Sequence, residues 1–231
     1  MLDQDMREPL FDYLDLNFGK IRILEEKVIR GSRADVLGVL DGYFVGFEIK
    51  SDQDTYTRLK SQVKDYDRFC DFCYIVVGAS HRKHVAEHVP DHWGILVVTE
   101  DGVEMDRGAD DNPEEHLLEN QITLMWKREL QQLLEMNDCP KYAGKSRKFI
   151  AEKLLERVEH VRLKAQMTDL IFERDYTVFE DQPTVSEKKV RRKRAVAAKR
   201  AVAGDRARAH TAHYVGRRKT RTKNKNKNKK K

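Results

Sequence analysis

Three residues whose side chains suit metal-assisted hydrolysis lie close together in the segment RADVLGVLDGYFVGFEIK, residues 33–50. They are Asp35, Glu48 and Lys50. Two carboxylates that leave coordination positions open are suited to hard divalent cations such as Mg²⁺ or Mn²⁺, which also bind phosphate oxygens. A lysine beside them can polarise a water or hold an anionic transition state. These residue types therefore predict hydrolysis of a phosphodiester.

The segment that carries these residues has the pattern of a β-hairpin. Two runs rich in Val, Leu, Ile and Phe flank the dipeptide Asp-Gly at 41–42, which is typical of a type I′ turn. If the loop consists of those two residues, Leu40 pairs with Tyr43. Counting outward from that pair then places Asp35 directly across from Glu48.

Alternation along a strand puts Glu48 and Lys50 on the same face of the hairpin as Asp35. Two like charges directly opposed on a sheet are destabilising unless something compensates them, and a divalent cation between the carboxylates would do so. A Glu-x-Lys sequence is also typical of the solvated face of a half-buried sheet, so a purely structural interpretation stays open.

The elements around the hairpin predict an α/β fold. Apolar spacing predicts a helix at about 6–18 and a second one from the Ser51 to Asp54 region to about Phe69. Strands are predicted at 22–29, 72–78 and 94–99. The resulting order is α-β-β-β-α-β.

This order and its motif resemble the PD-(D/E)xK, or restriction-endonuclease-like, nuclease superfamily. The similarity rests on Asp35, on Glu48-Ile49-Lys50 in the next strand, and on a helix with Gln62 and Tyr66. The Gln-x-x-x-Tyr spacing is similar to that of the RecB-like branch, and EIKSDQDTYTRLKSQVKDYDRF resembles a group of small bacterial and phage proteins assigned to DNA repair. The resemblance covers roughly residues 6–100, and Ala34 stands where the family has a proline.

The resemblance implies a nuclease domain at residues 1–108 that uses Mg²⁺ or Mn²⁺. Asp35 and Glu48 would be metal ligands, with the Ile49 carbonyl as a third. Lys50 would activate the attacking water, and Gln62 would approach the active site or the substrate backbone. A glutamate from the first helix often completes such sites; that role is expected of Glu8, or alternatively of Glu25.

The second predicted helix also carries residues expected to contact nucleic acid. Leu59, Val63 and Tyr66 form a core-facing stripe. Arg58, Gln62 and Tyr66 lie four apart on the shoulder of that stripe, so the helix can both pack on the sheet and reach the site. We predict that Arg58 and Tyr66 face the substrate beside Gln62. The alternative is that Arg58 and Gln62 are ordinary surface residues.

Residues 109–182 are predicted to form a helical extension. One helix is expected to start at Pro113 and to continue its apolar stripe to Leu134, and further helices are expected from about Ser146 and Val161. The stretch GKSRKFIAEKLLERV weakly resembles DNA-binding modules of the SAP type, in which Lys145, Arg147 and Lys148 would meet phosphates. A helical hairpin packed on the core, or a homodimer contact, is the alternative.

A basic tail is predicted at residues 183–231. From Thr184 onward the chain has 20 lysines and arginines and two acidic residues, so the remainder is acidic, with 25 basic and 37 acidic residues. The tail is low in complexity and is expected to be disordered when free, and to bind nucleic acid without sequence preference. Arg191, Arg192, Lys193 and Arg194 are its densest cluster. A solubility tail or an RNA-binding appendage is the alternative.

Composition argues against several other classes of protein. No apolar run approaches the roughly 18 residues of a membrane span, and three cysteines fit a reducing compartment, so a cytoplasmic protein is expected. The predicted partner is nucleic acid, in the first instance DNA. The rival to the nuclease hypothesis is a non-catalytic nucleic-acid-binding protein that keeps the fold as a platform.

Overall fold

The computed structural model describes residues 1–114 and 117–175, and residues 1–174 form one compact unit. The border predicted at residue 108 lies inside this unit, and the predicted tail at 183–231 lies outside the described residues. The helices, with η for short 3₁₀ turns, are α1 (Asp3–Phe18), α2 (Leu59–Asp67), η1 (Ala79–His81), η2 (Val85–Glu87), α3 (Leu117–Gln121), η3 (Ile122–Leu124), α4 (Lys127–Met136), α5 (Arg147–Arg157) and α6 (His160–Phe172). The strands are β1 (Arg22–Ile29), β2 (Ser32–Leu40), β3 (Tyr43–Lys50), β4 (Phe72–Gly78), β5 (Gly94–Thr99) and β6 (Gly102–Arg107).

The described strands form a six-stranded open sheet in the order β1-β2-β3-β4-β5-β6. Strands β1, β2 and β3 are antiparallel, β3, β4 and β5 are parallel, and β6 returns antiparallel to β5. The α/β class is therefore confirmed, as are the bounds predicted for β1, β4 and β5. The sequence did not predict β6, because half of its residues GVEMDR are charged and all are half-buried or exposed.

The register of the hairpin is the one expected from its two-residue loop. Leu40 pairs with Tyr43, and pairing continues outward to Val36 and Phe47. The expected type I′ turn is wrong, because that turn needs a positive φ at both central residues and only Gly42, at +73°, has one. The Gly42 amide donates to Thr168 Oγ1 of α6 at 3.0 Å, so a tertiary contact holds the turn.

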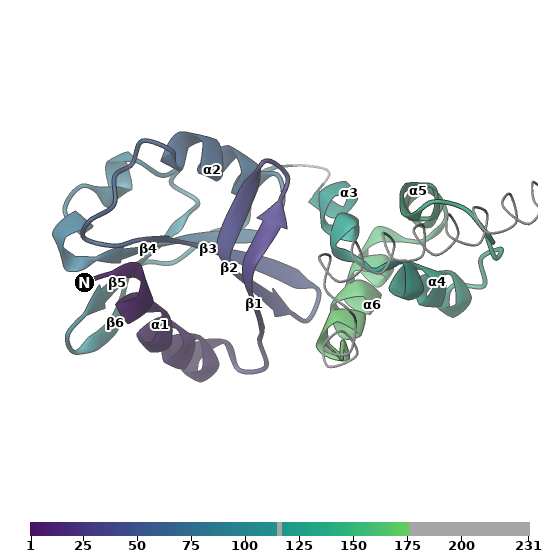
Figure 1. The fold of residues 1–231 in the computed structure, drawn as a ribbon, viewed down its shortest axis with the longest axis horizontal. Helices are drawn as coiled ribbons and strands as arrows, with labels where there is room; N and C mark the ends of the chain where they lie inside the picture. The colour runs from purple at the N-terminus through teal and green to yellow at the C-terminus, as the bar shows by residue number, and fades with distance from the viewer. Residues whose placement is uncertain (115–116, 176–231) are drawn as a thin grey trace, which may run out of the picture. The chain divides into compact units, whose positions relative to one another are not determined.

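Helices α1 and α2 cover opposite faces of the sheet (Figure 1). The face toward α1 is a continuous apolar core. Its buried members from α1 and the strands are Met6, Leu10, Leu14, Val36, Val45, Phe47, Ile49, Tyr74, Val76, Leu96 and Val98. The face toward α2 receives the alternate residues of β2 and β3, and these include the predicted catalytic side chains.

The helical extension packs against the sheet, which agrees with the alternative of helices packed on the core. Lys164 of α6 pairs with Asp71 at the start of β4, and Gln121 Nε2 donates to the Phe69 carbonyl at 2.8 Å. Within the part of the chain that the structure describes, no helix combines the length and apolar character needed to cross a membrane.

The single helix expected from Pro113 to Leu134 is wrong, because the chain breaks after η3. Trp126 is extended there, with ψ at 158°, and its amide donates to Glu129 Oε2 at 2.6 Å, which caps the new helix α4. Glu129 is buried and ion-paired with Arg174. The carboxylate that caps α4 is thus also paired with an arginine 45 residues away.

Candidate metal and phosphodiester site

The predicted catalytic residues come together at the ends of β2 and β3. Asp35 lies in β2 one residue beyond the last recorded pair of the hairpin, and its Oδ2 accepts from the Ile49 amide at 2.9 Å. Glu48 and Lys50 of β3 point to the same face, and the Lys50 ammonium pairs with Glu48 Oε1. This register agrees with the placement expected from the loop length, because Asp35 and Glu48 are the next residues outward from the pair of Val36 and Phe47.

Glu48 is fully buried and only partly hydrogen-bonded. Its Oε1 accepts from Lys50 and from Gln62 Nε2 of α2, and the Lys50 ammonium also donates to the Ile49 carbonyl at 3.3 Å. Its Oε2 is also buried but has no hydrogen-bond partner among the described residues. Burying an unpaired carboxylate oxygen is costly, so this arrangement leaves an acceptor available to a further group.

Asp35 is electrostatically strained by the same arrangement. Burial and the neighbouring Glu48 carboxylate raise the pKa of the Asp35 carboxyl to about 7, against the smaller opposing effects of the Ile49 amide and Lys50. A cation bound between the two carboxylates would remove this repulsion, so the arrangement is typical of a cation site.

Tyr66 has a structural position, and its predicted role in contacting nucleic acid is wrong. Its side chain is fully buried, and its hydroxyl accepts from the Asp35 amide and donates to the Phe47 carbonyl, both at 3.2 Å. Burial and the nearby carboxylates raise its pKa well above the usual value, so the donor proton is retained. A Cβ at Gly46 would lie 2.5 Å from the Tyr66 ring, so this glycine allows α2 to approach β3.

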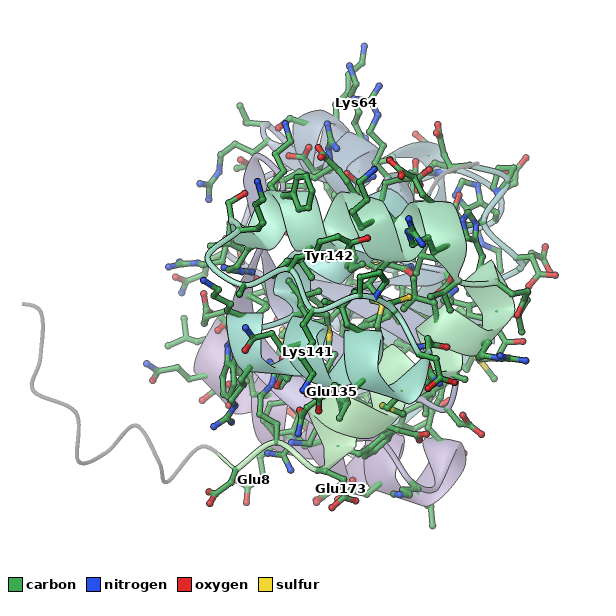
Figure 2. The ribbon with its side chains drawn as sticks, turned by 90° about the vertical axis from the view of Figure 1, so that its right-hand side faces the viewer. Glu8, Lys64, Glu135, Lys141, Tyr142 and Glu173 are labelled. Atoms are coloured by element: carbon green, nitrogen blue, oxygen red, sulfur yellow. The ribbon has the colours of Figure 1, made fainter. Side chains whose placement is uncertain are left out.

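The residue of α1 that lies near the carboxylate site is not the predicted Glu8. Glu8 is exposed and projects outward (Figure 2), so its assignment as a metal ligand is wrong. It lies on a helix whose inner side is taken by Met6 and Leu10. Asp3 is instead the α1 carboxylate that acts on the pKa of Asp35.

Arg7 is a site residue that the sequence reasoning missed. Its guanidinium donates to Asp3 Oδ2 and to Glu25 Oε2, each at 2.9 Å, and lies 3.5 Å from the Asp35 carbonyl. Glu25, the alternative metal ligand, is therefore an exposed ion-pair partner of this arginine. The i, i+4 spacing of Asp3 and Arg7 was visible in the sequence, but its contact with β2 was not.

A cleft of about 270 Å³ opens beside the carboxylates. It is lined by Gly31, Ser32, Arg33, Asp35, Arg58, Ser61 and Gln62. Arg58 is exposed at its rim, as predicted for a residue facing substrate. Arg33 was missed, although it stands two residues before Asp35 and so shares its face of β2. Two arginines and the Asp35 carboxylate thus line one opening.

The donor set fits a hard cation held by few protein ligands. Asp35 and Glu48 supply carboxylate oxygens. The Ile49 amide donates to Asp35, and the Ile49 carbonyl and Glu48 both accept from the Lys50 ammonium. Across residues 1–114 and 117–175 there is no cluster of three or more His, Cys, Asp or Glu side chains placed to hold a metal. A cation here would keep several waters, as Mg²⁺ usually does.

The remaining predicted nucleic-acid contacts lie elsewhere. Arg147 of α5 donates to the carbonyls of Thr123 and Met125, both at 2.7 Å, so it ties α5 to the break before α4. Lys145 and Lys148 are exposed on the same segment. The cluster Arg191, Arg192, Lys193 and Arg194 lies outside the described residues.

Comparisons with known proteins give a family and two weak structural likenesses. The protein SPO1766 of unknown function from Silicibacter pomeroyi matches with a TM-score of 0.40 and 23% identity, over 61% of this chain and 99% of that one. SfsA from Pyrococcus furiosus, solved in complex with Ca²⁺, matches with a TM-score of 0.28 and 14% identity, over 46% of this chain and 61% of that one. The search of curated proteins found no match. The family model for bacteriophage P4 protein cII matches residues 8–198, more than half of the chain, and the protein therefore belongs to the bacteriophage P4 protein cII family.

Proposed function

We propose that this protein is a metal-dependent nuclease that hydrolyses phosphodiester bonds in DNA. The observation that carries the proposal is the pair formed by Asp35 and the buried Glu48, whose Oε2 has no hydrogen-bond partner among the described residues. The element order from α1 to β4 agrees with the restriction-endonuclease-like core that the sequence motif implies.

Asp35, Glu48 and the Ile49 carbonyl would hold Mg²⁺ or Mn²⁺. When bound, such an ion supplies a Lewis acid for a phosphate oxygen and lowers the pKa of a water. It would also neutralise the repulsion that raises the pKa of Asp35. The repulsion between Asp35 and Glu48 in the metal-free protein therefore favours binding of a cation.

The other side chains of the site hold the carboxylates in place and supply positive charge for the substrate. The Lys50 ammonium contacts both Glu48 and the Ile49 carbonyl, where it can hold a water or an anionic oxygen at the same edge. Gln62 keeps Glu48 in place from α2. Arg33 and Arg58 line the cleft and would meet the phosphates of the substrate strand.

The proposal is tested by incubating the purified full-length protein with labelled linear, circular, nicked and branched DNA, with and without Mg²⁺. We expect cleavage that requires the ion, and a loss of about 10³-fold in rate for Glu48→Gln, because metal-held charge stabilisation is worth several kcal/mol. The matched control is Glu100→Gln, the same change on an exposed residue after β5. Cleavage that survives in Glu48→Gln would refute the proposal.

A non-catalytic nucleic-acid-binding protein is the second candidate. It is favoured by the observation that the described residues offer two carboxylates and no third acidic ligand at this site. Wild-type protein that binds DNA but cuts none of the four substrates, in Mg²⁺ or in Mn²⁺, would establish this alternative.

A further inference from the structure

Three aromatic rings contact one another in the segments that follow β3 and β4. Tyr56, in the loop before α2, lies 4.0 Å from the ring of His88 at an interplanar angle of 26°, and 5.0 Å from the ring of His81 in an edge-on contact. His88 is exposed, so it forms the outer end of this stack. The Tyr56 hydroxyl is covered and has no partner among the described residues, so the ring rather than the hydroxyl defines its contacts.

The stack forms one wall of a hollow of about 410 Å³. Its lining residues are Tyr56, Leu59, Lys60, Val63, Glu87, His88, Val89 and Pro90. The carboxylate cleft is lined by Arg58, Ser61 and Gln62. The first turns of α2 therefore separate the two openings, which are about 10 Å apart if the thickness of one helix separates them.

Hydrogen bonds connect the ring cluster to the strand that carries Lys50. His81 Nε2 hydrogen-bonds to the Ser51 carbonyl at 3.0 Å, and Ser51 directly follows Lys50. The Ser51 hydroxyl and amide both donate to Asp54 Oδ2, at 2.6 and 2.9 Å, so the loop that leads to Tyr56 is well supported. A group bound on the rings would thus be held at a defined place relative to the carboxylates.

The chemistry of the hollow suits a flat, largely neutral ring. The exposed face of His88, backed by Tyr56, offers a π surface, and Leu59 and Val63 supply apolar contacts. Glu87 disfavours a phosphate inside the hollow. Lys60 is exposed and makes no ion pair with the described residues, so it can meet a phosphate at the rim. A nucleobase with its phosphate outside fits this distribution.

We propose that this hollow binds an unpaired nucleobase of single-stranded DNA beside the phosphate that is cut, an inference that rests on the nuclease function proposed above. In a duplex both faces of each base are already stacked, so such a hollow selects single strands, frayed ends or bases turned out of the helix. A strand that places one base on His88 reaches the carboxylate cleft within roughly one or two nucleotides.

The test measures binding of the full-length protein to a short single strand containing 2-aminopurine, and to the duplex of the same sequence. EDTA removes metal so that no cleavage is needed, and about 0.3 M salt suppresses sequence-independent phosphate contacts. We expect His88→Ala to weaken single-strand affinity about tenfold and to abolish most quenching of 2-aminopurine, because stacking is lost. Duplex affinity should change less than about twofold.

Two variants serve as controls. His84→Ala removes an exposed histidine that contacts Glu87 and not Tyr56, and should bind single strands as the wild type does. Tyr56→Phe keeps the ring and should also bind normally. Unchanged affinity and quenching in His88→Ala, or a loss in Tyr56→Phe as large as in His88→Ala, would overturn the proposal. A protein that shows this His88-dependent preference but never cuts DNA would refute the nuclease function and leave the base site standing.

Discussion

Strand β3 has two faces that serve opposite purposes. Phe47 and Ile49 point toward α1 into an apolar core, whereas Glu48 and Lys50, which alternate with them, are buried toward α2. The first face gains stability from burial. On the second, Glu48 lies beside the like-charged Asp35 of β2 and keeps an unpaired carboxylate oxygen. Burial of the apolar face thus stabilises the fold enough to tolerate the repulsion between carboxylates on the other face.

The largest effect is expected on the apolar face. Phe47 is fully buried and stacks on Tyr74 with ring centroids 5.3 Å apart. Phe47→Ala should lower the free energy of unfolding by about 3–5 kcal/mol, and the melting temperature by about 10 °C, because it leaves a cavity. Thermal denaturation measures this, and Phe47→Leu should lose far less. A loss under about 1 kcal/mol would show that the apolar face does not carry the fold.

The charged face should respond in the opposite direction. Asp35 has a pKa of about 7 in the folded protein and an ordinary value near 3.8 when unfolded, so its ionisation destabilises the fold as pH rises between those values. Asp35→Asn can keep the bond from the Ile49 amide, and should stabilise the metal-free protein by about 2–4 kcal/mol at pH 8.

The stabilisation by Asp35→Asn should depend on pH, which distinguishes an effect of the Asp35 charge from other causes. At pH 3, below both the folded and the unfolded pKa of Asp35, both states of the wild type are largely protonated, so the difference between Asp35→Asn and wild type should nearly vanish. Denaturation in EDTA at the two pH values measures it, with Asp101→Asn, on an exposed turn, as the control. A variant that is less stable than wild type at pH 8 would contradict the account of strain.

A smaller loss of stability is expected when the Tyr66 hydroxyl, which bonds to both β2 and β3, is removed. Tyr66→Phe removes a hydroxyl that bonds both the Asp35 amide and the Phe47 carbonyl, and should cost about 1–2 kcal/mol. Tyr43→Phe removes a hydroxyl from a half-exposed ring, and should cost almost nothing. Equal stabilities for the two variants would mean that Tyr66 does not hold β2 and β3 in place.

Sequence patterns predicted the features that depend on neighbouring residues, namely the hairpin register and the bounds of the buried strands. The loop at 41–42 set the hairpin register, and alternation then placed Asp35, Glu48 and Lys50 on one face. Continuous apolar runs gave β4 and β5 their bounds. These features depend on neighbours in the sequence and on the period of a strand.

Features that depend on distant partners were missed. The start of α4 is set by Glu129, which pairs with Arg174. The turn residue Gly42 bonds to Thr168 of α6, and Arg7 of α1 contacts the carbonyl of Asp35, 28 residues later in the chain. The core-facing stripe predicted the packing of Tyr66 on the sheet, but its complete burial, which rules out contact with nucleic acid, depends on the space left by Gly46 of β3.

Binding of Mn²⁺ at pH 8, followed by calorimetry and by the electron paramagnetic resonance signal of the free ion, tests the central claim most directly. We expect the wild type and Glu100→Gln to bind the ion alike, and Asp35→Asn and Glu48→Gln each to bind it at least about tenfold more weakly, because each loses a carboxylate ligand. Equal Mn²⁺ affinity in all four proteins would contradict a metal site between Asp35 and Glu48.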